Sequence, residues 1–271
     1  MSQKTIGIIG FGNMGSAIAA RAKNLFEIIV FDKDKSKTAG CSGIKVADTI
    51  SGLVDESDAM ILAVKPQDID SILGEIKRCL KGQLIITIAA GISTQYIEGR
   101  LDKARVIRVM PNLPAQIGQG VSGLYKGKYC NEQDLDLAWQ LLSCVGMVVP
   151  FDDEKMIDAV TAVSGSGPAY FCYYIKDKAN AESQKNEFVK QLTGAAISIG
   201  FDKILAAGLS EKTAEGTLAL LIEKNLSCEE LIKNVTSKGG TTEAALNVLN
   251  KGGSLEDAVK AALKRARELS K

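Results

Sequence analysis

The sequence predicts an α/β fold, with an N-terminal Rossmann-type, doubly wound and mainly parallel sheet followed by an all-helical C-terminal domain. Five short apolar runs recur in the first half, at residues 6–9, 28–31, 59–64, 84–88 and 106–110. These runs are continuously apolar rather than alternating, which is typical of parallel strands buried on both faces, and helix-compatible segments lie between them. From about Asp153, alanine- and leucine-rich helical segments replace the strands.

The change of pattern predicts two domains, residues 1–152 and residues 153–271, joined without a low-complexity linker. In the second domain a helix is predicted over residues 255–269. Its apolar residues recur at helical spacing, at Leu255, Ala258, Val259, Ala262 and Ala266.

The composition excludes several classes of function. Lysine and arginine number 33 against 32 aspartates and glutamates, so we expect no nucleic acid and no membrane as partner. Histidine is absent, which removes the commonest acid/base catalyst and the Ser-His-Asp triad. The six cysteines form no close pairs, so we expect no metal site and a reducing, cytoplasmic location.

A dinucleotide-binding motif follows the first predicted strand. The run Gly10-Phe11-Gly12-Asn13-Met14-Gly15 is GxGxxG between a strand and a helix, the arrangement that brings backbone amides onto a pyrophosphate. The next strand ends at Asp32, 22 residues after Gly10, where an acid can bind a ribose hydroxyl.

The role of Asp32 has an alternative, because the charged stretch at residues 32–37 also reads as a solvated turn. An aspartate at this position favours NADH over NADPH through repulsion of a 2'-phosphate, but Lys33, Lys35 and Lys37 offset that charge. The sequence therefore leaves NADPH or NADH open.

Further segments resemble one known family along nearly the whole chain. Ala63-Val64-Lys65-Pro66 and Ala89-Ala90-Gly91 follow the third and fourth predicted strands, where an open parallel sheet binds ligands. Ser164-Gly165-Ser166-Gly167-Pro168-Ala169-Tyr170 and Thr236-Ser237-Lys238-Gly239-Gly240-Thr241-Thr242 are the more specific runs. With these runs the chain resembles the pyrroline-5-carboxylate reductases, which make proline.

The resemblance implies hydride transfer from NADPH or NADH to the imine of 1-pyrroline-5-carboxylate, giving L-proline. It also implies a C-terminal domain that forms a homodimer or a higher homo-oligomer of dimers. The cofactor-binding residues would be Gly10, Phe11, Gly12, Asn13, Met14, Gly15, Asp32, Ala63, Val64, Lys65, Pro66, Ala89, Ala90 and Glu154. The substrate-binding residues would be Asn234, Ser237, Gly239, Gly240, Thr241 and Thr242, with Thr242 as the catalytic proton donor.

The residue types support imine reduction independently of the family resemblance. Glycines flanked by hydroxyl residues at 237–242 make an amide concavity suited to a carboxylate, the alternative being a flexible turn. A protonated imine already attracts hydride, so an imine reductase needs no histidine. For Glu154 the alternative is an acid at a helix N-terminus, and for Lys65 it is a surface lysine.

The chain departs from the family pattern in three places. Lys238 stands where a proline is usual, and Thr49-Ile50 replaces a cofactor-contacting asparagine. A polar segment at 176–189 adds about four helical turns. Because that length nearly preserves the helical phase, we expect one continuous helix over residues 167–199 with its polar middle in solvent.

Two other functions compete. A β-hydroxyacid dehydrogenase-like oxidoreductase shares the domain order, but it relies on a catalytic lysine in the helix after its substrate loop. A non-catalytic dinucleotide-binding protein is the second, because a fold alone does not establish turnover.

Overall fold

The computed structural model describes residues 3–177, 179 and 181–270. By compactness these residues form two units. Unit 1 comprises the described residues up to Val109 and Leu124–Glu154, and unit 2 comprises Met110–Gly123 and Lys155–Ser270. Residues 110–123 thus count with unit 2, although they precede residue 152 in the chain.

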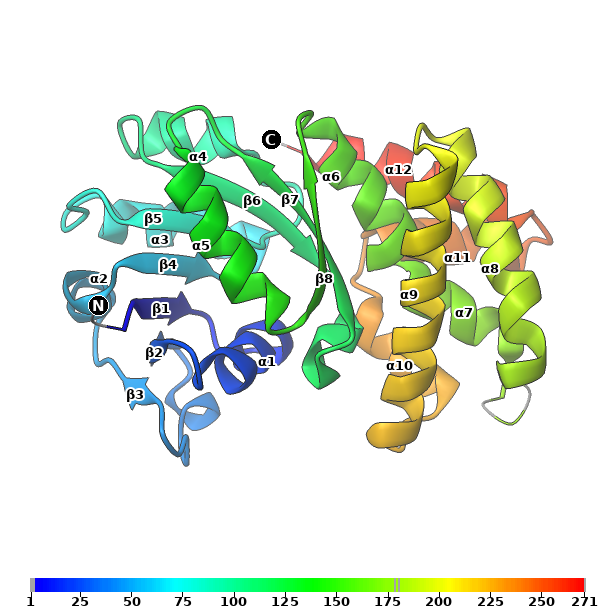
Figure 1. Cartoon of the computed structure of the whole chain (residues 1–271), viewed down its shortest axis with the longest axis horizontal. Helices are drawn as coiled ribbons and strands as arrows, with labels where there is room; N and C mark the ends of the chain where they lie inside the picture. Colours follow the sequence, from blue (N-terminus) through cyan, green and yellow to red (C-terminus); the bar gives the residue numbers. More distant parts are fainter. Residues whose placement is uncertain (1–2, 178, 180, 271) are drawn as a thin grey trace. The chain divides into compact units, whose positions relative to one another are not determined.

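The chain forms a sheet of eight strands in the order β3-β2-β1-β4-β5-β6-β7-β8, most of whose residues belong to unit 1 (Figure 1). The strands are β1 (Thr5–Ile9), β2 (Glu27–Phe31), β3 (Lys45–Val46), β4 (Ala59–Leu62), β5 (Leu84–Thr87), β6 (Val106–Pro111), β7 (Gly120–Lys126) and β8 (Gly146–Phe151). The helices between them are α1 (Asn13–Ala22), α2 (Ile50–Glu56), α3 (Ile69–Ile76), α4 (Thr94–Arg100) and α5 (Glu132–Ser143).

The predicted parallel sheet is confirmed. Strands β3, β2, β1, β4, β5 and β6 pair in parallel, and in this register Ile6 lies between Ile28 and Ala59. The five predicted apolar runs match β1, β2, β4, β5 and β6 to within two residues, and their side chains are almost wholly buried, as strands covered by helices on both faces require. Strands β3, β7 and β8 were not among the predicted runs.

Two helices of unit 1, α2 and α5, begin at a polar residue whose side chain caps them. The Thr49 side chain accepts a hydrogen bond from the Gly52 amide at 3.1 Å and starts α2. Asn131 and Asp134 form a reciprocal capping box that starts α5. Thr49, which departs from the family pattern, therefore has a structural use here.

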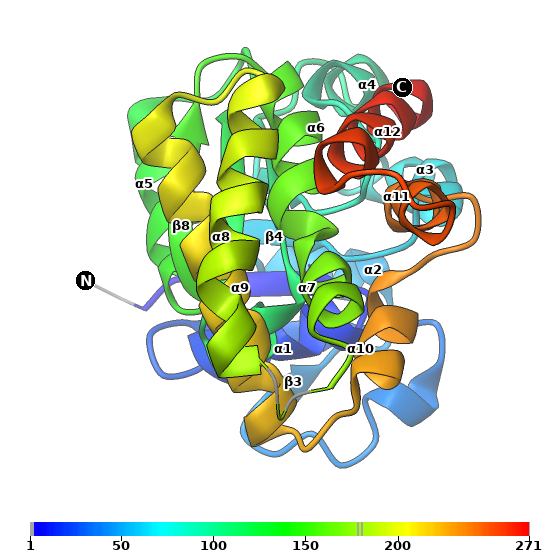
Figure 2. The same ribbon diagram turned by 90° about the vertical axis from the view of Figure 1, so that its right-hand side faces the viewer.

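Unit 2 adds the helices α6 (Lys155–Val160), α7 (Gly167–Ile175), α8 (Ala181–Ser198), α9 (Lys203–Glu223), α10 (Cys228–Val235), α11 (Thr241–Asn250) and α12 (Leu255–Leu269). One π-helical turn, Thr161–Gly165, lies between α6 and α7. Figure 2 shows α8 and α9 side by side. Helix α12 confirms the predicted helix over residues 255–269, and its five predicted apolar residues are all buried.

The expected continuous helix over residues 167–199 is wrong. Helix α7 ends at Ile175, Lys176 takes a left-handed φ of 58°, and α8 begins at Ala181. The rings of Phe171 and Phe188 meet edge to face with centroids 5.1 Å apart. In a continuous helix these residues would lie about 25 Å apart, so burial of the two rings against each other favours a reversal of the chain. Lys178 and Asn180, within the predicted helix, lie outside the described residues.

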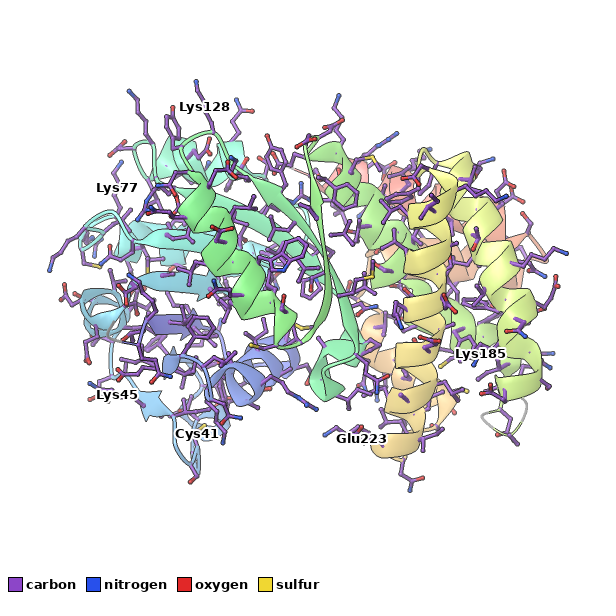
Figure 3. The ribbon with its side chains drawn as sticks, in the orientation of Figure 1. Cys41, Lys45, Lys77, Lys128, Lys185 and Glu223 are labelled. Carbon is purple, nitrogen blue, oxygen red and sulfur yellow. The ribbon has the colours of Figure 1, made fainter. Side chains whose placement is uncertain are left out.

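Several charged side chains of the described residues form ion pairs on the surface. Figure 3 labels several lysines, and three of them, Lys45, Lys77 and Lys185, each pair with an acidic side chain. All six cysteines are free thiols. None of the helices in the described part of the chain combines the length and the apolar character needed to cross a bilayer.

Candidate functional site

The glycine-rich loop lies at the carboxyl end of β1, beside the end of β4. Strand β1 pairs with β2 on one side and with β4 on the other, so this is the point where the strand order reverses. Such a reversal point is where open parallel sheets bind ligands. Gly10 donates its amide to the Phe31 carbonyl at 2.8 Å, and Ala63 donates to the Ile9 carbonyl at 2.8 Å.

The three glycines of the motif have different surroundings, so a side chain would have a different effect at each of them. Gly10 has a φ of +99°, and a side chain there would meet the Ala63 carbonyl oxygen at 2.5 Å. At Gly15 a Cβ would lie 2.0 Å from the Gly10 carbonyl oxygen, so this glycine allows α1 to pack against the loop. At Gly12 a Cβ would meet no atom within 4 Å. Packing therefore explains Gly10 and Gly15, whereas the space in front of Gly12 is open.

Asp32 is buried, with 7% of its surface exposed. Its Oδ2 accepts a hydrogen bond from the Phe11 amide at 2.7 Å, and its Oδ1 accepts one from the Asp34 amide at 2.8 Å. The Lys37 ammonium lies 3.5 Å from Oδ2. The interpretation of Asp32 as a solvated turn residue is therefore wrong. Its carboxylate ties the loop after β1 to the loop after β2.

The remaining predicted cofactor residues of unit 1 surround the same sheet edge. Ala63 and Val64 follow β4 and lie against Gly10. Lys65 is exposed and precedes the short 3-10 turn that begins at Pro66. Of the residues that follow β5, Ala89 is buried and Ala90 is exposed. In the loop itself Asn13 is exposed and Met14 is half-buried.

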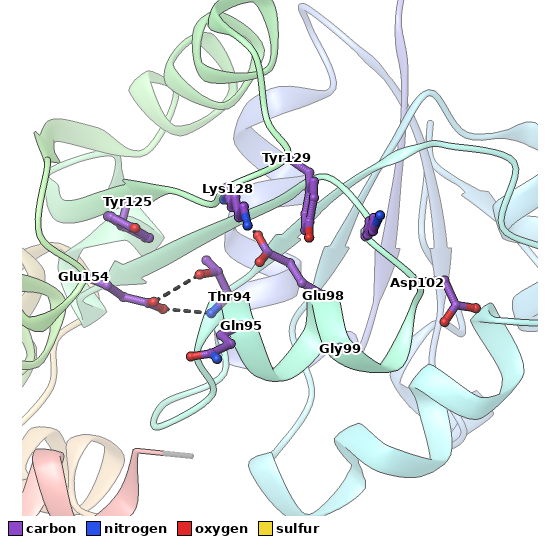
Figure 4. A pocket seen from close by; sticks show the side chains of 10 residues that line it. Thr94, Gln95, Glu98, Gly99, Asp102, Tyr125, Lys128, Tyr129 and Glu154 are labelled. Carbon is purple, nitrogen blue, oxygen red and sulfur yellow. Dashed lines mark hydrogen bonds between the residues drawn. The ribbon is translucent and has the colours of Figure 1, made fainter.

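Glu154 has different neighbours. Its carboxylate accepts hydrogen bonds from the Thr94 amide at 2.8 Å and the Thr94 hydroxyl at 3.0 Å, and it lies 3.5 Å from the buried Arg108 guanidinium. It lines a cavity of about 640 Å³ together with Thr94, Gln95, Glu98, Gly99, Asp102, Lys103, Tyr125, Lys128 and Tyr129 (Figure 4). The glycine-rich loop contributes no residue to this lining, so a cofactor role for Glu154 stays a prediction without a contact to support it.

The electrostatics of this cavity follow from its buried acids. Burial raises the pKa of the Glu98 carboxyl, the Lys128 amide that donates to it opposes the shift, and the charge of Glu154 adds to it. Burial likewise raises the pKa of the Tyr125 phenol, with Glu154 contributing next. The cavity lining thus combines the acids Glu98, Asp102 and Glu154 with the lysines Lys103 and Lys128.

The predicted substrate segment, residues 236–242, joins α10 to α11 in unit 2. Gly239 has a φ of +70°, donates its amide to Glu243 Oε2 at 2.7 Å, and accepts from Arg265 Nε at 2.7 Å through its carbonyl. Gly240 donates to the Ser237 carbonyl at 3.0 Å, and a Cβ on Gly240 would lie 2.2 Å from Ser237 Oγ. These contacts hold the segment in one shape, so it is not a loose turn.

The end of that segment is the start of α11. Gly240 is its N-cap residue and has no side chain to cap the first amides. The N-terminus of this 10-residue helix therefore offers backbone N–H groups and the positive end of the helix dipole to an anion. Asn234 lies exposed in the last turn of α10, and Ser237 and Lys238 are also exposed.

Three hydroxyl groups gather at this helix start. Thr242 Oγ1 donates to Ser166 Oγ at 3.0 Å, and Thr241 Oγ1 lies 3.1 Å from the same Ser166 oxygen. Thr242 is 4% exposed and Ser166 is 1% exposed, whereas Thr241 is half-buried. The structure thus brings the predicted proton donor together with a serine 76 residues earlier in the chain.

Sequence reasoning missed three residues of this region. Ser166 was quoted only as part of a motif, and its position at the start of a helix after a glycine was the available signal. Glu243 and Arg265 brace Gly239 from α11 and α12. Nothing in their local sequence distinguishes them from ordinary charged helix residues, because the contact depends on how the helices pack.

Family models match both parts of the chain. The model described as pyrroline-5-carboxylate reductase dimerisation matches residues 154–186 and 186–269. The model described as NADP oxidoreductase coenzyme F420-dependent matches residues 5–91.

Two relatives that match along the whole chain are pyrroline-5-carboxylate reductases. A pyrroline-5-carboxylate reductase of Pseudomonas aeruginosa is 36% identical over 282 residues, covering 100% of this chain and 98% of that protein. One from Methanosarcina acetivorans is 33% identical, with 100% of both chains covered.

Solved structures agree with this picture. The reductase of the same name from Coxiella burnetii has a TM-score of 0.67 and 31% identity, with both chains fully covered. A Plasmodium falciparum pyrroline carboxylate reductase with NADP bound has a TM-score of 0.65 and 25% identity, again over both whole chains. A 3-hydroxyisobutyrate dehydrogenase of Mycobacterium tuberculosis, at 14% identity and a TM-score of 0.52 over 87% of this chain and all of that one, shares the fold alone.

Proposed function

This chain belongs to the pyrroline-5-carboxylate reductase family, and from that premise we propose that it reduces 1-pyrroline-5-carboxylate to L-proline with NADPH or NADH. The observation that carries the proposal is the start of α11, where uncapped amides stand beside the Thr242 hydroxyl. An anion-binding helix end next to a buried proton donor suits a substrate with a carboxylate one bond from its ring.

The glycine-rich loop supports cofactor binding in unit 1. The open space at Gly12 fits the close approach of a pyrophosphate to backbone amides, since nothing of the protein fills it. A bound reduced nicotinamide supplies hydride. The loop residues Gly10 to Gly15 would hold the phosphates, and Asp32 would accept from a ribose hydroxyl with the lone pairs left free by Phe11 and Asp34. The segments 63–66 and 89–90 would line the same sheet edge.

The start of α11 supports substrate binding in unit 2. The Gly239 and Gly240 amides already donate within the protein, so the carboxylate would bind the amides of Thr241 and Thr242, with the exposed Ser237 hydroxyl as a further donor. Backbone amides at a helix start bind anions, and here the Glu243 carboxylate of the same turn is bound to the Gly239 amide rather than to those of Thr241 and Thr242. Asn234, exposed at the end of α10, is proposed as a contact at the edge of this site.

Thr242 is the proposed proton donor. The imine accepts hydride when its ring nitrogen is protonated, so a proton must reach that nitrogen as hydride reaches the carbon, and the buried Thr242 hydroxyl donates it. Glu154 lies in unit 1 on Thr94 and Arg108, and we assign it no step.

The geometry favours this function over the two alternatives. A β-hydroxyacid dehydrogenase needs a catalytic lysine in the helix after its substrate loop, whereas α11 reads TTEAALNVLN and contains none. A protein that binds only dinucleotides has no use for a braced, hydroxyl-lined anion site in its second unit.

Self-association through unit 2 completes the proposal. Ile204 and Ile222 on α9 are 86% and 65% exposed, and their spacing of 18 residues is about five helical turns, which places them on one face. We assign this face to a homodimer contact, from which higher oligomers of dimers are built. The six free thiols support a reducing, cytoplasmic location.

One assay tests the function. Oxidation of NADH or NADPH is followed by absorbance with 1-pyrroline-5-carboxylate as substrate, and with a β-hydroxyacid and the oxidised cofactor as the comparison. We expect turnover with the imine alone. Turnover with the hydroxyacid only would show that the protein is a β-hydroxyacid dehydrogenase-like enzyme. Cofactor binding without turnover of either substrate would support the non-catalytic alternative.

A further inference from the structure

The Ser166 hydroxyl does not cap the helix that Ser166 precedes. Ser166 is the N-cap residue of α7, where a serine side chain ordinarily accepts from an amide of the first turn, yet it makes no such bond. Its backbone is helical, with φ −88° and ψ −17°, which turns the side chain away from those amides. The hydroxyl contacts Thr241 and Thr242 instead.

The surroundings hold Ser166 rigidly. Its amide donates to the Thr161 carbonyl at 2.9 Å, which closes the π-helical turn before it. Such turns shift the phase of a helix and often occur at functional sites. The next residue, Gly167, has Thr213 so close that a Cβ would lie 2.6 Å from its methyl group. These contacts fix the backbone from which the Ser166 side chain reaches the two threonines.

The Tyr170 phenol is a further hydroxyl that interacts with Ser166. Burial raises the pKa of the Tyr170 phenol, and the Ser166 hydroxyl acts on it in the opposite direction. Tyr170 donates its own proton to the Ala162 carbonyl at 3.1 Å. Its proton is therefore committed to the backbone, so Tyr170 braces Ser166 and is not a source of protons for it.

The number of protons in this cluster determines the order in which they can move from one hydroxyl to the next. Each of the three hydroxyls carries a single proton. In the structure Thr242 donates to Ser166, so the Thr242 hydroxyl must turn from Ser166 to the ring nitrogen to give up its proton, and Ser166 must then turn its own proton to Thr242 to replace it. Thr241 can in turn replace the Ser166 proton, because either atom of that pair can be the donor. Thr241 is half-buried, whereas the other two are buried, so it is the member that reaches solvent.

We propose that Ser166 is a positioning and proton-relay residue, the middle member of a chain from solvent through Thr241 and Ser166 to Thr242. The inference rests on the proposed function. As the Thr242 O–H bond breaks, an N–H bond forms on the substrate. The Ser166 proton then passes to Thr242, the Thr241 proton passes to Ser166, and water returns one to Thr241. Each hydride transferred consumes one solvent proton, and all three hydroxyls are restored.

The test removes each relay member separately. Ser166→Ala is expected to lower kcat about tenfold or more while KM and cofactor affinity stay within about twofold. Thr241→Val cuts the solvent end and is expected to lower kcat by less, and Thr241→Ser is expected to restore it. Ser210→Ala is the matched control, because Ser210 is fully buried in unit 2 and donates only to Ala206 of its own helix.

The solvent deuterium isotope effect on kcat separates a relay from packing. We expect it to rise in Ser166→Ala and in Thr241→Val, since proton delivery becomes slower, and to be unchanged in Ser210→Ala. If kcat and the isotope effect in Ser166→Ala match the wild type, the relay is wrong, and a loss confined to KM or shared with Ser210→Ala also overturns it.

Two further outcomes keep the test decisive. If Ser166→Ala does not fold, the Thr241→Val and Thr241→Ser pair decides, and equal kcat in both overturns the relay. A folded wild-type protein that binds NADPH but does not reduce 1-pyrroline-5-carboxylate overturns the proposed function, and the relay with it. If the wild type is active and the variants keep its kcat and isotope effect, the relay is wrong and the proposed function stands.

Discussion

The carboxylate of Asp32 accepts a hydrogen bond from the Phe11 amide at 2.7 Å. This bond joins the end of β2 to the glycine-rich loop after β1, and it exists whatever the loop binds. Asp32 therefore combines a structural task with its proposed task at the ribose. A substitution that separates the two must keep the acceptor and remove the charge.

Asp32→Asn removes the charge and keeps one acceptor oxygen for the Phe11 amide, while its NH2 group gives up the hydrogen bond from the Asp34 amide. We expect it to raise the ratio of NADPH to NADH affinity by roughly three- to tenfold, because the 2'-phosphate no longer meets a negative charge. Fluorescence titration with each cofactor measures the ratio. Asp34→Asn, which removes the same charge from the neighbouring exposed turn, is the control. Equal ratios in wild type and Asp32→Asn would show that Asp32 does not read the ribose.

Gly12 and Gly15 should respond differently to the same change. Gly12→Val places its side chain in open space, so we expect a folded protein that has lost cofactor affinity by about tenfold or more. Gly15→Val drives a side chain against the Gly10 carbonyl and should lower the free energy of unfolding by about 1–3 kcal/mol or more. Thermal unfolding and cofactor titration of both variants check this. A folded Gly12→Val variant with wild-type affinity would refute the proposed pyrophosphate site.

Thr242→Val tests the proton donor. The change keeps the shape of a buried side chain and removes its hydroxyl, so turnover should fall by roughly tenfold or more while cofactor affinity is nearly intact. Thr217→Val is the matched control, because Thr217 is fully buried and its hydroxyl donates to Thr213 within α9. Steady-state kinetics measure both. Near-normal turnover in Thr242→Val would move the donor role to water or to another group.

Phe188 should be a major determinant of the stability of unit 2. It is fully buried and packs on Phe171 and Tyr174 of α7. Phe188→Ala is expected to lower the free energy of unfolding by about 3–5 kcal/mol. Lys190→Ala, two residues later and exposed on the same helix, should change it by less than about 0.5 kcal/mol. Denaturant unfolding that finds the two variants equally stable would contradict the packing of α8 on α7.

The exposed isoleucines of α9 should control self-association. Ile204→Glu combined with Ile222→Glu places charges on the proposed dimer face and should shift the protein toward monomer in sedimentation experiments. Leu25→Glu is the control, since Leu25 is 63% exposed in unit 1. A double variant that sediments as the wild type would place the dimer contact elsewhere.

Local patterns in the sequence were enough for the elements whose cause is local. Continuous apolar runs predict buried parallel strands, and helical spacing from Leu255 to Ala266 predicts α12. The glycine-rich loop and the segment at 236–242 are likewise identified by their order along the chain. In each of these cases the structure follows from residues that are close together in the sequence. They determine the burial of a strand on both faces, the apolar side of a helix or a positive φ in a loop.

Only the tertiary structure decided which distant residues meet. The Asn112 side chain donates to the Ser164 carbonyl and accepts from the Val121 amide, which ties residues 110–123 to unit 2. The length of the polar segment near Lys176 was compatible with one long helix, but burial of Phe188 against Phe171 is satisfied only if the chain reverses.

The site shows the same division. Thr242 was predicted from its motif, whereas its partner Ser166 lies 76 residues earlier and the brace Arg265 lies on another helix. Spacing along the chain determines which groups are available. Packing of the helices determines which of their hydroxyls and charges come within hydrogen-bonding distance, because that distance is set by side chains from several elements at once.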